Sequence, residues 1–192
     1  MNIDIIDSKS NEKLSAYIKD IILIISFTMA MIISSYIKVP LFPVPFTMQT
    51  FVVVLSSFVI ANRKACIPQI IYLLYGFTGA MVFSNGGGIL YVFSPTFGYI
   101  LGFVVMAYVI SYMIEKCNNV NMTLKRLIAI GSIGVIIQLS IGTSYLYVVS
   151  NTILDTNISI IDTVIKGSII FLPYDILKVI LAGIIAKQTP KT

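Results

Sequence analysis

Asp175 and Lys178 are the residues best placed to do chemistry, because both lie inside a long apolar segment near the C-terminus. They are three positions apart, so on a helix they share one face about one turn apart. If the segment crosses a membrane, each ionisable side chain costs about 2.5–3.5 kcal/mol and must face the interior of a bundle. Pro173 frees a backbone carbonyl one turn earlier. Two interpretations remain: the charges only neutralise each other, or they bind a polar ligand.

Further polar residues stand at the ends of other apolar segments. Thr47, Gln49 and Thr50 follow a proline-rich stretch, Asn85 lies in a glycine-rich stretch, and Tyr99 begins another apolar segment. Amide side chains offer both donors and acceptors, which suits an uncharged ring such as a urea or a lactam. Polar residues are common at helix ends, so each of these signals is weak alone.

Two other features each have a structural and a functional interpretation. Tyr145, toward the outer end of an apolar segment, is either a membrane-interface anchor or a ligand contact. Ser26, Ala30 and Ser34 recur every four residues and form a ridge of small side chains, which lets another helix approach closely in lipid. That helix belongs either to this chain or to another subunit.

The composition indicates which solvent these elements are built for. Of the 192 residues, 57% are hydrophobic and 11% are charged, and the mean hydropathy is +0.96. Soluble domains carry about 25% charged residues, so we expect an all-α polytopic membrane protein in contact with a lipid bilayer. The net charge of +5 comes from short basic clusters between apolar runs, which favours membrane orientation over nucleic-acid binding. The absence of histidine and of clustered ligands predicts no metal site.

Six apolar segments are long enough, or nearly so, to span a bilayer, which needs about 20 residues. They cover residues 14–37, 48–61, 65–82, 96–115, 125–149 and 163–187, and the second is short. We therefore expect one membrane domain over residues 1–192. It consists of an N-terminal segment (1–13), a six-helix bundle (14–187) and a tail (188–192).

The basic residues predict the orientation of this bundle. The first, third and fifth connections contain one clear basic residue, Lys38, and ten of the other basic residues lie at the termini and in the second and fourth connections. These are Lys9, Lys13, Lys19, Arg63, Lys64, Lys116, Lys125, Arg126, Lys187 and Lys191. The positive-inside rule then places both termini in the cytoplasm, for a protein of the cell membrane.

Two of the outer connections are expected to be structured. The first contains three prolines, which forbid regular helix and favour an extended path. The third contains three successive glycines among apolar and aromatic residues. Both are interpreted either as lids that fold back over the outer mouth of the bundle or as tight connections at the membrane surface.

Four motifs in order along the chain resemble the BioY family, the biotin-specific substrate-binding (S) components of energy-coupling factor transporters. They are VPFTMQT at 44–50, FSNGGG at 83–88, SPTFGYILGF at 94–103, and FLP-x-D-x-x-K at 171–178. Ser94 and Tyr174 replace glycines usual in the family, and Tyr145 stands where tryptophan is frequent. Tyr174 neighbours the key pair, so it either narrows the pocket or faces lipid.

The resemblance implies a six-helix fold with an outward-facing, loop-capped biotin pocket and no cofactor. Asp175, Lys178 and Asn85 would be the principal ligand contacts, with Thr47, Gln49, Tyr99 and Tyr145 around them. Lys178 would meet either the ureido oxygen or the valerate carboxylate. The ridge of Ser26, Ala30 and Ser34 resembles the family's docking surface for a transmembrane coupling protein, which works with two cytoplasmic ATPases.

The sequence therefore predicts a transporter subunit rather than an enzyme. It has no G-x-x-x-x-G-K-S/T loop with which to hydrolyse ATP, so partner subunits would supply the energy. The alternatives are an S component for another vitamin, an intramembrane enzyme that uses Asp175 as acid or base, and a structural membrane protein. The absence of histidine and of a second membrane-embedded carboxylate argues against the enzyme.

Overall fold

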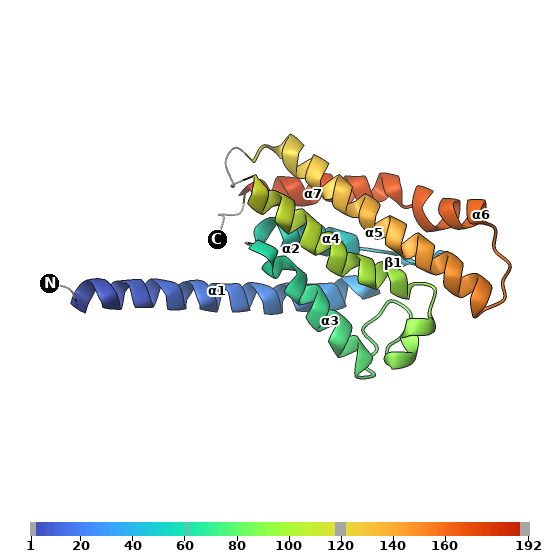
Figure 1. Cartoon of the computed structure of the whole chain (residues 1–192), viewed down its shortest axis with the longest axis horizontal. Coiled ribbons are helices and arrows are strands. Elements are labelled where there is room, and N and C mark those ends of the chain that lie inside the picture. Colours follow the sequence, from blue (N-terminus) through green and yellow to red (C-terminus); the bar gives the residue numbers. More distant parts are fainter. Residues whose placement is uncertain (1–2, 61, 118–121, 189–192) are drawn as a thin grey trace.

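A computed structural model describes residues 3–60, 62–117 and 122–188, which form a helical bundle with one long helix at its side (Figure 1). The long helix, α1 (Ile3–Tyr36), packs on α2 and α3, and its N-terminal half projects beyond the bundle. The other helices are α2 (Gln49–Val59), α3 (Ile67–Phe77), α4 (Phe97–Lys116), α5 (Leu124–Thr152), α6 (Ile160–Val164) and α7 (Leu172–Gln188).

Short elements connect these helices. A hairpin of β1 (Lys38–Val39) and β2 (Phe46–Thr47) follows α1, and the 3₁₀ turns η1 (Asn62–Cys66) and η2 (Ile89–Phe93) precede α3 and α4. A π-helical turn, η3 (Ile165–Ile169), joins α6 to the segment before α7. As the prolines predict, this connection contains no helix, but it is extended only at residues 38–39 and 46–47, and residues 40–45 between them form the bend of the hairpin.

Four helices of the described chain are long and apolar enough to span a membrane. They cover Lys13–Tyr36, Phe97–Lys116, Leu124–Thr152 and Ile160–Gln188, and they match four of the six predicted spans. The helices α2 and α3 have 11 residues each, so each rises about 16 Å, roughly half of a bilayer core. The prediction of a third span over 65–82 is wrong in extent, because α3 ends at Phe77 and the chain turns at Gly79 with a φ of +99°.

The distribution of side chains is that of a protein built for lipid. Large apolar residues are exposed on the outward faces, including Ile22 and Ile25 on α1 and Ile136 on α5. Polar residues are buried between the helices, among them Gln49, Gln69, Gln138, Asp175 and Lys178. The bundle therefore presents an apolar surface and holds a minority of polar side chains within a largely apolar core.

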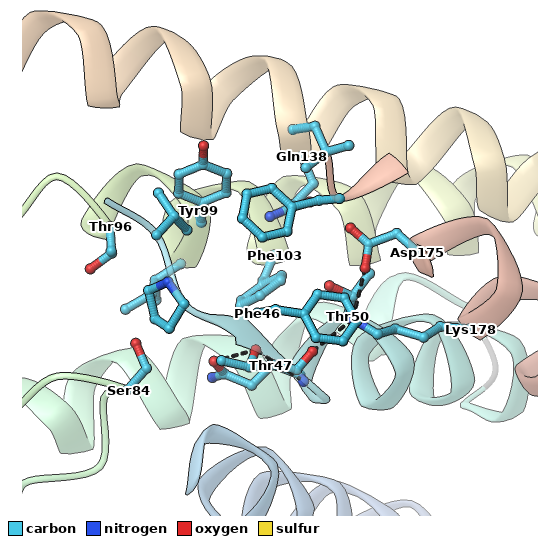
Figure 2. Close-up of a pocket in the computed structure, with 16 residues that line it drawn as sticks. Phe46, Thr47, Thr50, Ser84, Thr96, Tyr99, Phe103, Gln138, Asp175 and Lys178 are labelled. Carbon is cyan, nitrogen blue, oxygen red and sulfur yellow. Dashed lines mark hydrogen bonds and ion pairs between the residues drawn. The ribbon is translucent and has the colours of Figure 1, made fainter. Parts of the chain in front are cut away.

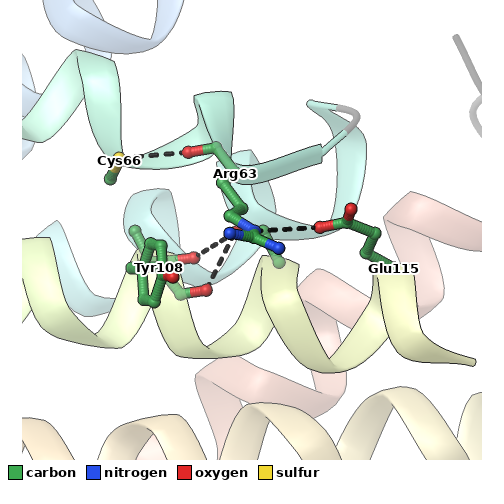
Figure 3. Close-up of polar contacts among 6 residues, drawn as sticks. Arg63, Cys66, Tyr108 and Glu115 are labelled. Atoms are coloured by element: carbon green, nitrogen blue, oxygen red, sulfur yellow. Dashed lines mark hydrogen bonds and ion pairs between the residues drawn. The ribbon is translucent and has the colours of Figure 1, made fainter.

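The turn η1 fastens one end of the bundle together (Figure 3). Arg63 Nε lies 3.2 Å from Glu115 Oε2 at the end of α4, and the Arg63 guanidinium lies 5.2 Å from the centre of the Tyr112 ring. Lys64 Nζ lies 2.6 Å from Asp20 Oδ2 on α1. These basic residues are thus gathered at the end of the bundle where α4 ends and α7 ends (Figure 1).

Glycines bring α4 and α5 into close contact. A Cβ built at Gly102 would lie 2.9 Å from the carbonyl oxygen and 3.2 Å from the Cα of Gln138. Because both are backbone atoms, neither can yield without moving a helix. The α4–α5 pair forms one wall of the cavity described below, so its spacing sets the shape of that cavity.

We expect Gly102→Ala to lower the free energy of unfolding by about 1–2 kcal/mol. Overpacking costs about 1–3 kcal/mol, and the better helix propensity of alanine returns up to about 1 kcal/mol. The measurement is the midpoint of thermal unfolding in detergent, with Ser140→Ala at an exposed position of α5 as the control. A Gly102→Ala midpoint at or above that of the unmodified protein would contradict the close contact.

Candidate functional site

The ion pair predicted on the C-terminal helix is present and faces inward. Lys178 Nζ lies 2.8 Å from Asp175 Oδ1, and both side chains are about 5% exposed. The opposite face of α7 is exposed through Leu177, Leu181 and Tyr174, which is 58% exposed. Tyr174 therefore points outward, although the edge of its ring meets Phe46 at a centroid distance of 5.4 Å.

The proline-rich hairpin supplies the other partners of Lys178. The Thr47 carbonyl oxygen accepts a hydrogen bond from Lys178 Nζ at 2.7 Å. The same ammonium lies 3.7 Å from the centre of the Phe46 ring, a cation–π contact in a desolvated place. The proline-rich connection thus folds inward onto α7, as the lid interpretation predicts.

These residues enclose a cavity of about 50 Å³ (Figure 2). Its walls come from the hairpin, the start of α2, the glycine-rich loop, α4, α5 and α7. The lining residues are Val44, Pro45, Phe46, Thr47, Gln49, Thr50, Ser84, Thr96, Tyr99, Ile100, Phe103, Gln138, Leu139, Phe171, Asp175 and Lys178. Half of these residues are apolar or aromatic and half are polar or charged, so the cavity combines apolar surface with convergent polar groups, as small-molecule sites do.

Gln49 holds the hairpin in place rather than presenting a free amide. Its Nε2 donates to the Tyr72 hydroxyl at 2.9 Å, and its Oε1 accepts from the Thr47 hydroxyl at 3.2 Å. Tyr72 in turn donates to the Val82 carbonyl at 2.9 Å. This chain of hydrogen bonds links β2, α2, α3 and the segment after α3, so Gln49 positions the backbone that meets Lys178.

Tyr99 forms a wall of the cavity with its ring, while its hydroxyl is bonded elsewhere. The hydroxyl donates to the Gly167 carbonyl at 2.8 Å and lies 3.3 Å from Thr143 Oγ1. Gly167 belongs to the π-helical turn η3, and a Cβ there would lie 2.7 Å from the Tyr99 hydroxyl oxygen. Tyr99 therefore anchors the turn that precedes α7.

The structure does not bring Asn85 or Tyr145 into the cavity. Asn85 is exposed, and its Oδ1 accepts a hydrogen bond from Lys38 Nζ at 3.3 Å. Lys38 also donates to the Ser84 carbonyl, so it joins the hairpin to the glycine-rich loop. Tyr145 donates to the Val92 carbonyl and holds η2 against α5. Of the described residues of the glycine-rich loop, it is Ser84 rather than Asn85 that lines the cavity.

The ridge of small residues on α1 is only partly accessible. Ser26 is exposed and Ala30 is half-buried, but Ser34 is 3% exposed and donates to the Met31 carbonyl of its own helix. Because α1 packs on α2 and α3, the end of the ridge near the hairpin, at Ser34, is buried within the chain. Ser26 and Ala30 are therefore the accessible members of the ridge.

Sequence reasoning missed Phe46 and Gln138 as cavity residues. Phe46 belongs to the VPFTMQT motif, but its position over Lys178 depends on the fold of the hairpin, which the sequence does not specify. The burial of Gln138 could have been predicted, since its amide stands in the middle of the apolar run VIIQLSI. A polar residue at that depth of a span is expected to face the bundle interior.

Comparison with known proteins identifies the family. The family model described as "BioY family" matches residues 8–192. The chain is 34% identical over 171 residues to the "Probable biotin transporter BioY" of Lysinibacillus sphaericus, covering 89% of this chain and 86% of that one. It is 31% identical over 166 residues to the "Biotin transporter BioY" of Thermotoga maritima, covering 86% and 92%.

The fold has a counterpart of known structure. A crystal structure of "the S-component for biotin from an ECF-type ABC transporter" superposes with a TM-score of 0.79 and 20% sequence identity, covering 91% of this chain and 92% of that one. At this identity the likeness shows a shared fold. With the family match over nearly the whole sequence and the two relatives above 30% identity, the chain belongs to the BioY family.

Proposed function

We propose that this chain is the biotin-binding S subunit of an ECF-type importer in the cell membrane, with no resident cofactor. The observation that carries the proposal is the Asp175–Lys178 pair, which is buried but lines a cavity under the outer hairpin. The printed names of the relatives and of the structural neighbour support the same substrate.

The chemistry of the pair suits the ureido ring of biotin. Asp175 Oδ1 accepts from Lys178, and the carboxylate also has a hydrogen bond with the Thr50 side chain. An ionised carboxylate has about four acceptor positions, so it retains capacity to accept from a ureido N–H. An ammonium has three donors, and two of those of Lys178 serve Asp175 and the Thr47 carbonyl. The third is available for the ureido oxygen or for the valerate carboxylate. The apolar side chains of the lining suit the rest of the bicyclic ring.

The proposed topology is a single membrane domain with six crossings and both termini in the cytoplasm. The short helices α2 and α3 are the second and third crossings, completed by the hairpin on one side and by η1 on the other. A transmembrane coupling protein and two cytoplasmic ATPases would drive release, with Ser26 and Ala30 on the accessible part of α1 as the contact for the coupling protein.

Removing both charges of the pair is expected to weaken biotin binding at least about 100-fold. Two hydrogen bonds to charged groups, worth about 1.5–3 kcal/mol each, are lost. The double variant Asp175→Asn with Lys178→Met is preferred, because removing one partner alone leaves a buried unpaired charge and destabilises the fold.

The measurement is equilibrium binding of labelled biotin to the purified subunit, with competition by other unlabelled vitamins. Asp162→Asn with Lys187→Ala, which changes an exposed acid and an exposed base, is the matched control. Saturable binding that the double variant leaves unchanged would reject the site. Stronger competition by another vitamin would reject the substrate.

We expect Lys38→Met to accelerate biotin association. Sites for drug-sized ligands measure about 300–1,000 Å³, so the cavity of about 50 Å³ must widen when the outer connections part. Lys38 holds the hairpin to the glycine-rich loop, and loss of a hydrogen bond of about 0.5–1.5 kcal/mol corresponds to a rate about two to ten times higher. Stopped-flow measurement of the association rate tests this, and an unchanged rate would show that entry follows another route.

The topology predicts which cysteines a membrane-impermeant maleimide reaches. Cys117 is exposed at the end of α4, on the proposed cytoplasmic side, and Leu154 is exposed in the connection after α5, on the proposed outer side. In intact cells we expect labelling of Leu154→Cys, in a background with Cys66 and Cys117 replaced by serine. We expect labelling of native Cys117 only after permeabilisation. Labelling of Cys117 in intact cells would overturn the orientation.

A further inference from the structure

Gln138 is a polar residue at the centre of α5 whose side chain points into the cavity. It is 2% exposed, and it lines the cavity beside Leu139. Figure 2 shows the side chain directed away from α5, toward the space that Asp175 faces from α7. The two residues therefore approach the same space from different helices.

The Gln138 amide oxygen is buried without a hydrogen-bond partner anywhere in residues 3–60, 62–117 and 122–188. Buried carbonyl oxygens are almost always paired, because an unpaired one carries its full desolvation cost. Gln49, which lines the cavity from α2, shows the ordinary arrangement, since its amide bonds with both Thr47 and Tyr72. Gln138 thus has hydrogen-bonding capacity that its surroundings do not use.

Close packing keeps the Gln138 side chain directed toward the cavity. Gly102 on α4 packs against Gln138. A Cβ built at Gly102 would lie 3.1 Å from Gln138 Cγ and 2.9 Å from the backbone carbonyl oxygen of Gln138. The side chain has no room to swing toward α4. Rotation about its last bond remains open and exchanges the oxygen with the NH₂ group, so the amide can present an acceptor to the cavity.

We propose that Gln138 is a specificity-determining substrate contact, whose amide oxygen accepts a hydrogen bond from a ring N–H of the substrate. The proposal rests on the proposed function and adds to it. A cyclic urea carries two N–H donors, one on each side of its carbonyl. The Asp175 carboxylate, which also bonds Lys178 and Thr50, accepts from one of them, and Gln138 accepts from the other. A ring that lacks the second N–H leaves the buried Gln138 oxygen unpaired and is rejected.

The test compares Gln138→Met with Gln69→Met in equilibrium binding of labelled biotin. Methionine has a similar length and no hydrogen-bonding amide. Gln69 is the matched control, because its amide oxygen is also buried and unpartnered among the described residues, yet it does not line the cavity. We expect Gln138→Met to weaken binding about 10- to 100-fold, the range for a substrate donor left without its acceptor, and Gln69→Met to leave it unchanged.

A second measurement uses two biotin derivatives, each methylated on one ureido nitrogen. The unmodified protein is expected to discriminate against both. Gln138→Met is expected to lose its discrimination against one of them and to retain it against the other, which Asp175 contacts. Gln138→Leu carries the same expectation and replaces Gln138→Met if that variant does not fold.

The outcomes separate this inference from the proposed function. If the unmodified protein shows no saturable biotin binding, the proposed function fails and the role of Gln138 falls with it. If the unmodified protein binds biotin and Gln138→Met binds equally well, only the inference is overturned. It is also overturned if Gln69→Met weakens binding as much as Gln138→Met, since the effect would then be one of packing.

Discussion

The buried pair of Asp175 and Lys178 is the interaction on which the arrangement of this bundle depends. Two opposite charges 2.8 Å apart in an apolar interior lose their hydration, and each further hydrogen bond that they make offsets part of that cost. Neighbouring helices of an apolar bundle have few free acceptors, because their backbone groups are already paired. The acceptor for Lys178 therefore comes from non-helical backbone, the Thr47 carbonyl.

That requirement explains why the hairpin lies within the bundle. Its prolines keep residues 40–45 out of regular helix, and pairing of Lys38 with Thr47 ends the hairpin beside α7. The hairpin occupies depth that a full-length second span would fill, and α2 accordingly begins only at Gln49. The hydrogen bond between Gln49 and Tyr72 then joins α2 to α3 beside the strand β2 and helps to hold β2 in place. The short helix α2 and the inward position of the hairpin thus both follow from the need of Lys178 for a backbone acceptor.

The cost of placing polar groups in lipid also determines which features could be predicted from the sequence. The inward orientation of Asp175 and Lys178 was predictable, because the cost of a charge in lipid leaves one direction open. The burial of Gln138 follows the same rule and could have been predicted. The contacts of Asn85 and Tyr145 could not, because Asn85 lies in a loop and Tyr145, on α5, bonds to a carbonyl of the turn η2. Gly86 has a φ of +139°, and the loop it shapes directs Ser84 inward and Asn85 toward Lys38. The C-terminal end of α3 could not be predicted either, because it depends on the turn at Gly79.

The contact of Phe46 with Lys178 couples closure of the hairpin to the contents of the cavity. In the closed arrangement the ring shields the ion pair from water, which strengthens the attraction between the charges but also removes their hydration. A polar ring that hydrogen-bonds Asp175, Lys178 and Gln138 replaces the lost hydration, whereas an apolar guest does not. Such a substrate has a higher affinity for the closed state than for the open one, and this difference alone lets binding shift the hairpin toward closure.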